Sequence, residues 1–273
     1  MNRIEAIFDE LKSSRRKALM PFITAGDPDL ATTTAALPVL EQAGASIVEL
    51  GIPFSDPIAD GPVIQASMTW ALDKGICVSD VFDMVRELRQ DLRIGLVAMV
   101  SYSIVYRIGL NRFIDQAAKA GIDGFIFPDL AVEEAAPIVQ TVKKSGLIMS
   151  MLIAPGTPIE RARKIAELSS GFIYLLSRSG ITGEQASLPT ELPERISILR
   201  QDTDLPIAVG FGISNHHQVR QVVTVADAAI VGSAIVRRIG QHHDESPAAI
   251  ARHVGTFVGQ LAEGLSIASA SNR

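Results

Sequence analysis

The chain alternates between two patterns of apolar and polar residues. Short, nearly continuous apolar runs recur, and glycine, proline or polar residues follow each run directly. Such runs are typical of strands in a parallel sheet that is buried on both faces. Between the runs, apolar residues recur every three or four positions, which predicts amphipathic helices. The predicted strands are residues 18–24, 47–50, 94–100, 124–127, 147–153, 172–176, 206–209 and 228–231.

Eight strands that alternate with helices predict a (β/α)8 TIM barrel, and an open doubly wound sheet is the alternative fold. An extra N-terminal helix is predicted over residues 3–13. We expect one domain over residues 1–273, because no linker or low-complexity segment divides the chain, with a disordered tail at 268–273. The other predicted helices are residues 30–42, 79–91, 111–120, 133–145, 159–168, 190–200, 215–224 and 247–262.

Composition narrows the class of protein. The 273 residues carry a net charge of −5, so neither nucleic acid nor an anionic membrane surface is an expected partner. No apolar run reaches membrane-spanning length, and the N-terminus lacks the apolar core of a signal peptide. The single cysteine, Cys77, excludes an internal disulfide and fits a reducing compartment, so we expect a cytoplasmic protein.

The stretch 49–62 is the first candidate for chemistry. It begins at the end of an apolar strand and continues as a proline-rich loop that contains no lysine or arginine. Glu49 lies within the strand, where a charge is costly to bury without a partner. If Glu49 faces the barrel axis, its apolar surroundings raise its pKa and suit it to general acid–base catalysis. A Glu49 that faces the helices and pairs with an arginine is the alternative.

Two aspartates follow Glu49 in the same loop. Asp60 precedes glycine, and Asp-Gly favours a turn, which by itself is the simpler explanation of Asp60. Together with Glu49 over one ordered loop, Asp60 is a candidate second carboxylate. Asp56, between Ser55 and Pro57, is expected to cap the turn.

Glycine turns after the last two strands predict a phosphate site. Residues 210–214 follow the seventh strand and residues 232–235 follow the eighth, and each segment leads into a helix. In such barrels, phosphate often binds between these two loops, at backbone N–H groups of a helix N-terminus. Ordinary tight turns are the alternative. A third glycine pair, at 180–183, suits a lid that closes over a ligand.

Several residue types are missing from the predicted strand ends. No lysine lies at the C-terminal end of a strand, which excludes a Schiff-base aldolase lysine there. None of the five histidines lies in a strand with a second ligand, so we expect no catalytic metal. No Gly-x-Gly-x-x-Gly opens a helix after the first strand. The residues favour acid–base chemistry on a phosphorylated small molecule, without metal or cofactor.

The motifs also resemble those of a known family. The run ELGIPFSDP at 49–57, with ADGP at 59–62, is similar to the signature of the tryptophan synthase alpha chain. The similarity extends in order from about Ile4 to Leu265. Its other motifs are PFITAGDP at 21–28, SRSGITG at 177–183, GFGI at 210–213 and GSAIV at 232–236.

The resemblance implies a reaction and a partner. The reaction is cleavage of indole-3-glycerol phosphate to indole and glyceraldehyde 3-phosphate. The partner is the pyridoxal-phosphate-dependent beta chain, in a heterotetramer of two alpha and two beta chains, and this chain itself is expected to hold no cofactor. By motif, Glu49 corresponds to the general acid–base and Asp60 to the group that binds the indole N–H. The residues that correspond to substrate-binding positions are Phe22, Tyr102, Tyr174, Thr182, Gly183, Phe211, Gly212, Gly232 and Ser233.

Two loops depart from the family pattern. Ser103-Ile104 stands where Asn-Pro is usual, and Ala131 stands where proline is usual. Both loops belong to the face expected to meet the beta chain, so the details of docking are open. Two alternatives to an alpha subunit therefore remain: a stand-alone lyase that releases indole, and a weakly active subunit that mainly activates its partner.

Overall fold

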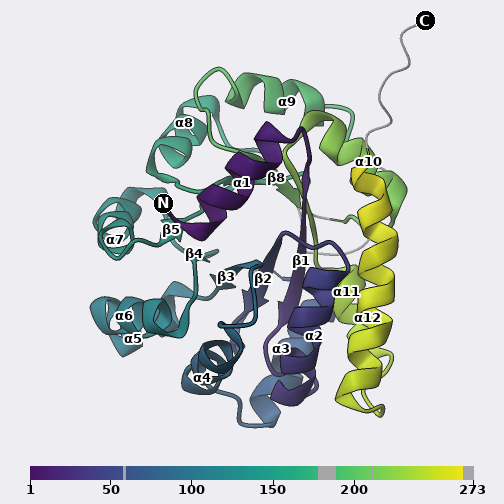
Figure 1. Ribbon diagram of the computed structural model, residues 1–273. Coiled ribbons are helices and arrows are strands. Elements are labelled where there is room, and N and C mark those ends of the chain that lie inside the picture. The colour runs from purple at the N-terminus through teal and green to yellow at the C-terminus, as the bar shows by residue number, and fades with distance from the viewer. Residues whose placement is uncertain (58–59, 178–188, 211, 267–273) are drawn as a thin grey trace, which may run out of the picture.

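A continuous sheet of parallel strands forms the centre of the molecule (Figure 1). The strands pair in the order β5-β4-β3-β2-β1-β9-β8-β7-β6. The computed structural model describes residues 1–57, 60–177, 189–210 and 212–266, and the predicted tail at 268–273 lies outside them. The strands are β1 (Ala18–Thr24), β2 (Ile47–Gly51), β3 (Gly95–Met99), β4 (Gly124–Ile126), β5 (Ile148–Met149), β6 (Leu152–Ile153), β7 (Ile173–Leu176), β8 (Ile207–Gly210) and β9 (Ala228–Val231).

The sheet curls into a barrel because its two terminal strands are pieces of one predicted strand. β5 pairs with β4, and β6 pairs with β7. Between the two pieces, Ser150 N donates to Phe125 O at 3.0 Å, while Tyr174 N donates to Met151 O at 3.2 Å. The segment between β5 and β6 therefore forms backbone hydrogen bonds with both β4 and β7. The (β/α)8 prediction is confirmed, and the open sheet is wrong; the single strand 147–153 is interrupted at 150–151.

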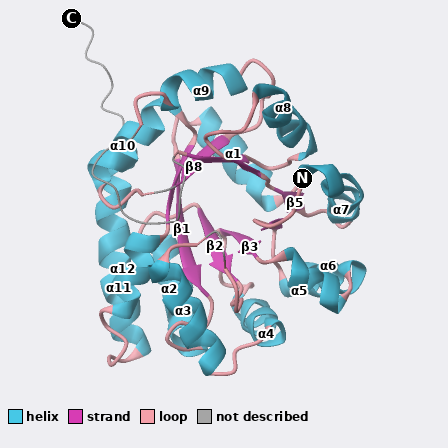
Figure 2. Cartoon of the chain, turned by 180° about the vertical axis from the view of Figure 1, so that it is seen from behind, coloured by secondary structure: helices cyan, strands magenta, loops and turns pink. Residues whose placement is uncertain are grey.

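Helices surround the strands (Figure 2). Helices α1, α2, α8 and α12 have the predicted bounds, and α4, α6, α7, α9 and α10 agree to within three residues. Helices α3 and α5 were not predicted; each follows a strand. The helices are α1 (Arg3–Ser13), α2 (Leu30–Gln42), α3 (Pro62–Asp73), α4 (Val78–Leu88), α5 (Tyr102–Ile108), α6 (Leu110–Ala120), α7 (Val132–Lys144), α8 (Ile159–Leu168), α9 (Leu192–Leu199), α10 (His216–Val225), α11 (Ser233–Gly240) and α12 (Pro247–Ala262).

Helix α1 is the predicted extra helix. Its apolar stripe, including Ile4 and Phe8, packs against interior residues of the barrel. The Phe8 and Phe172 ring centroids lie 5.9 Å apart. The Asn2 side chain accepts from Ile4 N and donates to the carbonyls of Asp123 and Gly146, each at 2.8 Å. This cap ties α1 to the segments that enter β4 and β5, at the amino ends of the strands.

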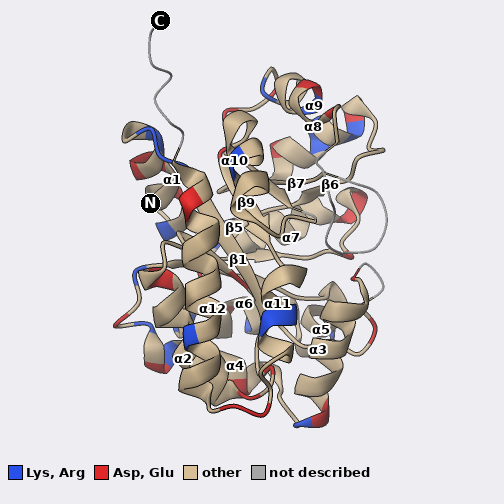
Figure 3. Ribbon diagram, turned by 90° about the vertical axis from the view of Figure 1, so that its right-hand side faces the viewer, with Lys and Arg blue, Asp and Glu red and all other residues tan. Residues whose placement is uncertain are grey.

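Charged residues are largely confined to the outside of the barrel. In Figure 3 the acidic and basic positions lie mainly on the helices and loops around the sheet. Among the described residues, the buried acidic side chains are Asp27, Glu49 and Asp123. Asp27 lies 2.9 Å from His243, and Asp123 pairs with Arg89 at 3.2 Å. Glu49 has no such ion pair in this part of the chain, and its Oε1 has no hydrogen-bond partner there. No helix of the described residues is long and apolar enough to cross a membrane.

Candidate active site

Strand β2 aims Glu49 into the barrel. The strand is buried along its whole length, and successive side chains point to opposite faces. Ile47 belongs to the interior cluster that contains Tyr174, whereas Val48 and Leu50 pack in the outer layer. Glu49 therefore faces the interior with Ile47, and it is 1% exposed. The prediction that Glu49 faces the barrel axis is confirmed, and the alternative of a pair with an arginine among the helices is wrong.

The environment of Glu49 favours the protonated carboxyl. Burial raises the pKa of Glu49 well above its usual value, and the charge of Asp60 raises it further. Burial also raises the pKa of Asp60, to about 6. At neutral pH, Asp60 is thus largely ionised, and its negative charge favours the protonated form of Glu49. Two carboxyl groups with separated pKa values can divide the roles of proton donor and charge stabiliser.

Tyr174 on β7 lies in the same interior space. Burial raises the pKa of Tyr174 well above its ordinary value, with smaller contributions from the charges of Glu49 and Asp60. A Cβ atom at Gly210 would lie 2.6 Å from the Tyr174 hydroxyl. The missing side chain at Gly210 therefore leaves room for the tyrosine ring. The structure brings Tyr174 together with the two carboxylates, as a shared site requires.

A cavity of about 270 Å³ opens beside Asp60. Its walls come from the loops that follow β2, β3 and β4, together with α3, so it lies at the carboxyl ends of the strands. Three of its lining residues are the acidic side chains of Asp56, Asp60 and Asp129. The remaining lining residues are Ile52, Phe54, Pro57, Met68, Met99, Val100, Ser101 and Pro128.

Some of the lining residues were not predicted from the sequence. Met68 lies on the unpredicted helix α3, for which Pro62 at the first helical position was an available start signal. Asp129 accepts hydrogen bonds from Ser101 Oγ at 2.6 Å and from Tyr102 N at 2.7 Å. It thus holds the start of α5 against the loop after β4. Ser101 is the N-cap of α5, and serine is a preferred residue at this position, so the sequence did contain a signal for the start of this helix.

The predicted phosphate residues lie at the ends of β8 and β9. Gly212 has φ +82°, a conformation that favours glycine. Gly232 is the N-cap of α11, and Ser233 is its first residue. Phe22 lies between this region and β2. A Cβ atom placed on Gly51 would lie 2.5 Å from the Phe22 ring, and a Cβ atom placed on Gly232 would lie 3.7 Å from the Phe22 Cβ.

The remaining predicted site residues are placed differently. Tyr102 does not line the cavity; its ring packs on Phe127, with centroids 5.8 Å apart. Thr182, Gly183 and Phe211 lie outside the described residues. For these three, the assignment remains a prediction.

The fold and the site define a class: a (β/α)8-barrel enzyme with interacting carboxyl groups at the carboxyl ends of its strands. A family model described as the tryptophan synthase alpha chain matches residues 8–265. The chain therefore belongs to the tryptophan synthase alpha chain family, and it is a carbon–carbon lyase of tryptophan biosynthesis.

Individual relatives agree with this family. The alpha chain of Rhodopirellula baltica is 48% identical, with 88% of this chain and 87% of the relative covered. The structure of the Legionella pneumophila alpha chain is 33% identical, covers 99% of each chain and has a TM-score of 0.88. A Mycobacterium tuberculosis tryptophan synthase structure is 31% identical, covers 97% of this chain and 98% of its own, and also has a TM-score of 0.88.

We expect Glu49→Gln to stabilise the folded chain at neutral and alkaline pH. A carboxyl with a raised folded-state pKa binds its proton more tightly when folded, so deprotonation above the unfolded pKa of about 4.3 favours unfolding. The amide removes this penalty. The gain should be absent below about pH 4 and grow up to the folded pKa, by about 1.4 kcal/mol per unit of elevation. Urea unfolding across this pH range measures it.

Glu87→Gln, on an exposed position of α4, is the matched control and should alter stability by less than about 0.5 kcal/mol. A Glu49→Gln chain that is less stable than wild type at pH 8 would contradict the uncompensated burial of Glu49.

Proposed function

We propose that the chain cleaves indole-3-glycerol phosphate to indole and glyceraldehyde 3-phosphate by carboxyl acid–base catalysis. The observation that carries this proposal is Glu49, a buried carboxyl without an ion pair among the described residues, beside Asp60 and Tyr174. A group held in this way is suited to give up a proton and to take one back. The resemblance of the motif to the family signature supplies the substrate.

Glu49 gives its proton to the indole ring carbon that carries the glycerol phosphate chain. The ring then bears positive charge and can accept the electron pair of the bond that breaks. As that carbon–carbon bond breaks, the adjacent hydroxyl of the substrate loses its proton to the Glu49 carboxylate and becomes the aldehyde. The proton balance closes, because Glu49 donates one proton and recovers one. Protonation makes the ring an electron sink, and this role requires neither a lysine nor a metal.

Asp60 has the complementary role in the proposal. It is largely ionised at neutral pH, so its carboxylate can accept the indole N–H and stabilise the positive charge that develops on the ring. The same negative charge favours the protonated form of Glu49 before the substrate reacts. Tyr174 supplies a neutral hydroxyl and an aromatic wall within the same barrel interior.

The phosphate would bind at Gly212, Gly232 and Ser233. The start of α11 offers backbone N–H groups that lack partners within the helix. The family pattern adds Gly183 and Phe211 to the phosphate and substrate contacts, and Thr182 to the lid. Phe22 would form part of the wall between the two halves of the site, and Tyr102 would contribute from the start of α5.

We also propose that the chain works with a beta chain that carries pyridoxal phosphate, in a complex of two alpha and two beta chains, and passes indole to it. A solved relative from Mycobacterium tuberculosis bears the name tryptophan synthase, which supports such a partner. The face around α5 exposes Tyr106 to 77%. A stand-alone lyase is the second candidate, favoured by the departures at Ser103, Ile104 and Ala131 on this face. The location in the cytoplasm remains an expectation.

Glu49→Gln tests the catalytic role. The amide keeps the shape of the carboxyl but has no transferable proton, so kcat should fall by roughly 10³-fold while KM for indole-3-glycerol phosphate stays within about twofold. Steady-state release of indole measures both constants. Glu87→Gln is the control for an exposed charge and should match wild type. A kcat above a tenth of the wild-type value would contradict the role of Glu49.

Gly232→Ala tests the phosphate site. Among the described residues, the three atoms nearest to a Cβ at this position belong to Phe22, at 3.7 to 3.9 Å, so the methyl group does not clash with this part of the chain. It would obstruct a phosphate that approaches the backbone closely. We expect KM to rise about tenfold with little change in kcat, while urea unfolding shows stability within about 0.5 kcal/mol of wild type. An unchanged KM would contradict phosphate binding at this turn.

Titration with a beta chain distinguishes an alpha subunit from a stand-alone lyase. If the chain is a subunit, indole release should be slow when the chain is alone and should rise by at least about tenfold as the beta chain saturates it, because binding selects the catalytically competent state. High activity alone, with no response to the partner, would identify a stand-alone lyase. Glu49→Gln in the same titration shows whether the activity arises in this chain.

A further inference from the structure

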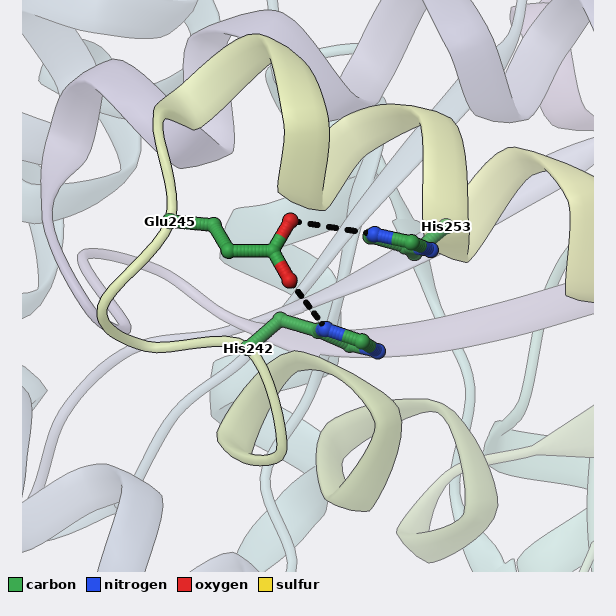
Figure 4. Close-up of side chains that lie close together, drawn as sticks. All are labelled: His242, Glu245 and His253. Carbon is green, nitrogen blue, oxygen red and sulfur yellow. Dashed lines mark hydrogen bonds and ion pairs between the residues drawn. The ribbon is translucent and has the colours of Figure 1, made fainter.

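Two histidines converge on one carboxylate at the end of the molecule formed by α11 and α12 (Figure 4). His242 and Glu245 lie in the turn between these helices, and His253 lies on α12. His242 Nδ1 is 2.7 Å from Glu245 Oε1, and His253 Nε2 is 3.0 Å from Glu245 Oε2. One ligand atom from each residue lies within 4.8 Å of the others. The two imidazole rings are nearly parallel, with centroids 3.9 Å apart and an interplanar angle of 6°.

This arrangement is held in place by the backbone around it. Glu245 N donates to His242 O at 2.9 Å, and His242 N donates to Ile239 O at 3.0 Å. The intervening His243 points inward, 2.9 Å from Asp27, and its ring lies tilted against Trp70 with centroids 4.6 Å apart. The turn is thus anchored from within, while His242 and Glu245 keep one ordered geometry. Preorganised ligands reduce the entropy that an incoming ion must overcome.

The three side chains are also accessible. The exposed fractions of the His242, Glu245 and His253 side chains are 22%, 41% and 45%. An ion can therefore reach the ligand atoms without opening the fold. The Arg238 guanidinium lies over the Phe257 ring, 4.9 Å from the ring centroid. The described residues show no ion pair between Arg238 and Glu245. Asp244, which is exposed, adds negative charge to the same turn.

We propose that His242, Glu245 and His253 form a binding site for a divalent transition metal of the zinc class. Two imidazole nitrogens, which are borderline ligands, together with one harder carboxylate oxygen form a donor set that binds Zn²⁺, with the fourth position left to water. None of the three residues lines the cavity beside Asp60, so the site is separate from the proposed lyase chemistry. A bound ion would join the 241–246 turn to α12 and stabilise the folded chain by binding it in preference to the unfolded one.

The hydrogens on the histidine ring nitrogens determine how metal binding depends on pH. An ionised carboxylate only accepts hydrogen bonds, so the histidine nitrogens that face Glu245 carry hydrogens when no metal is bound. Metal binding needs the lone pairs of those nitrogens. In a neutral histidine the hydrogen moves to the other ring nitrogen, whereas a charged histidine must release one proton. Because protons and the metal compete for these lone pairs, metal affinity should fall when the solution is acidified.

Calorimetric titration of the metal-free full-length chain with ZnCl2 at pH 7.5 tests the site. We expect one ion per chain with a dissociation constant on the order of micromolar. His253→Ala should weaken binding by about tenfold or more because it removes a ligand nitrogen, and the isosteric Glu245→Gln should do the same because a neutral amide replaces the charged carboxylate. Zn²⁺ should also raise the melting temperature of the wild-type chain but not that of His253→Ala.

His217→Ala is the matched control. His217 is exposed on α10, and its ring centroid lies 4.0 Å from that of His216 with the rings tilted, but this pair is not part of a carboxylate cluster among the described residues. The variant should bind Zn²⁺ as wild type does. Co²⁺ substituted for Zn²⁺ should give a visible absorption band that His253→Ala lacks. Binding only at millimolar Zn²⁺, or equal loss in His217→Ala and His253→Ala, would overturn the proposal.

Discussion

The burial of the Glu49 carboxyl is the constraint on which the active site depends. A buried acid is stable only when it is paired, hydrogen-bonded or protonated. Asp123 takes the first solution, with Arg89 beside it and Leu96 N at 2.8 Å. Glu49 has no ion pair among the described residues, and Asp60 adds a negative charge that strengthens the preference for the protonated state. The fold thus maintains a proton donor inside the barrel at the expense of some stability.

Strand order explains why the site can join acid–base chemistry to phosphate binding. β1 pairs with β2 on one side and with β9 on the other. Phe22 on β1 therefore contacts both the Glu49 strand, at Gly51, and the turn at Gly232. Closure of the barrel makes neighbours of segments that are almost two hundred residues apart in sequence. A substrate with an indole ring at one end and a phosphate at the other matches this division.

The sequence was most informative where burial is simplest. Strands buried on both faces appear as apolar runs, and alternation along 47–51 puts Glu49 on the same face as Ile47, but the structure was needed to show that this face points into the barrel. Helix α3 was missed because it begins at the end of the proline-rich loop after β2, and α5 was missed because it begins only three positions after the end of β3, in a polar segment that suggested a loop. The sequence did not indicate the break between β5 and β6, because Met151 continues the apolar run of the predicted strand. The His242, Glu245 and His253 cluster depends on the turn that brings α12 back beside α11, and spacing alone does not reveal it.

The prolines in the loop after β2 acquire a specific role from the contacts of Asp60. Asp60 N donates to Pro57 O at 2.9 Å, and Gln65 Nε2 donates to Asp60 O at 2.7 Å. Both bonds use the backbone, so they fix the position of Asp60 without occupying its carboxylate. Pro62 then starts α3 with a restricted φ, which limits the conformations open to the preceding residues. The proposed catalytic pair is therefore asymmetric: the sheet positions Glu49 by burial, whereas turn and helix-start geometry position Asp60 without using its carboxylate.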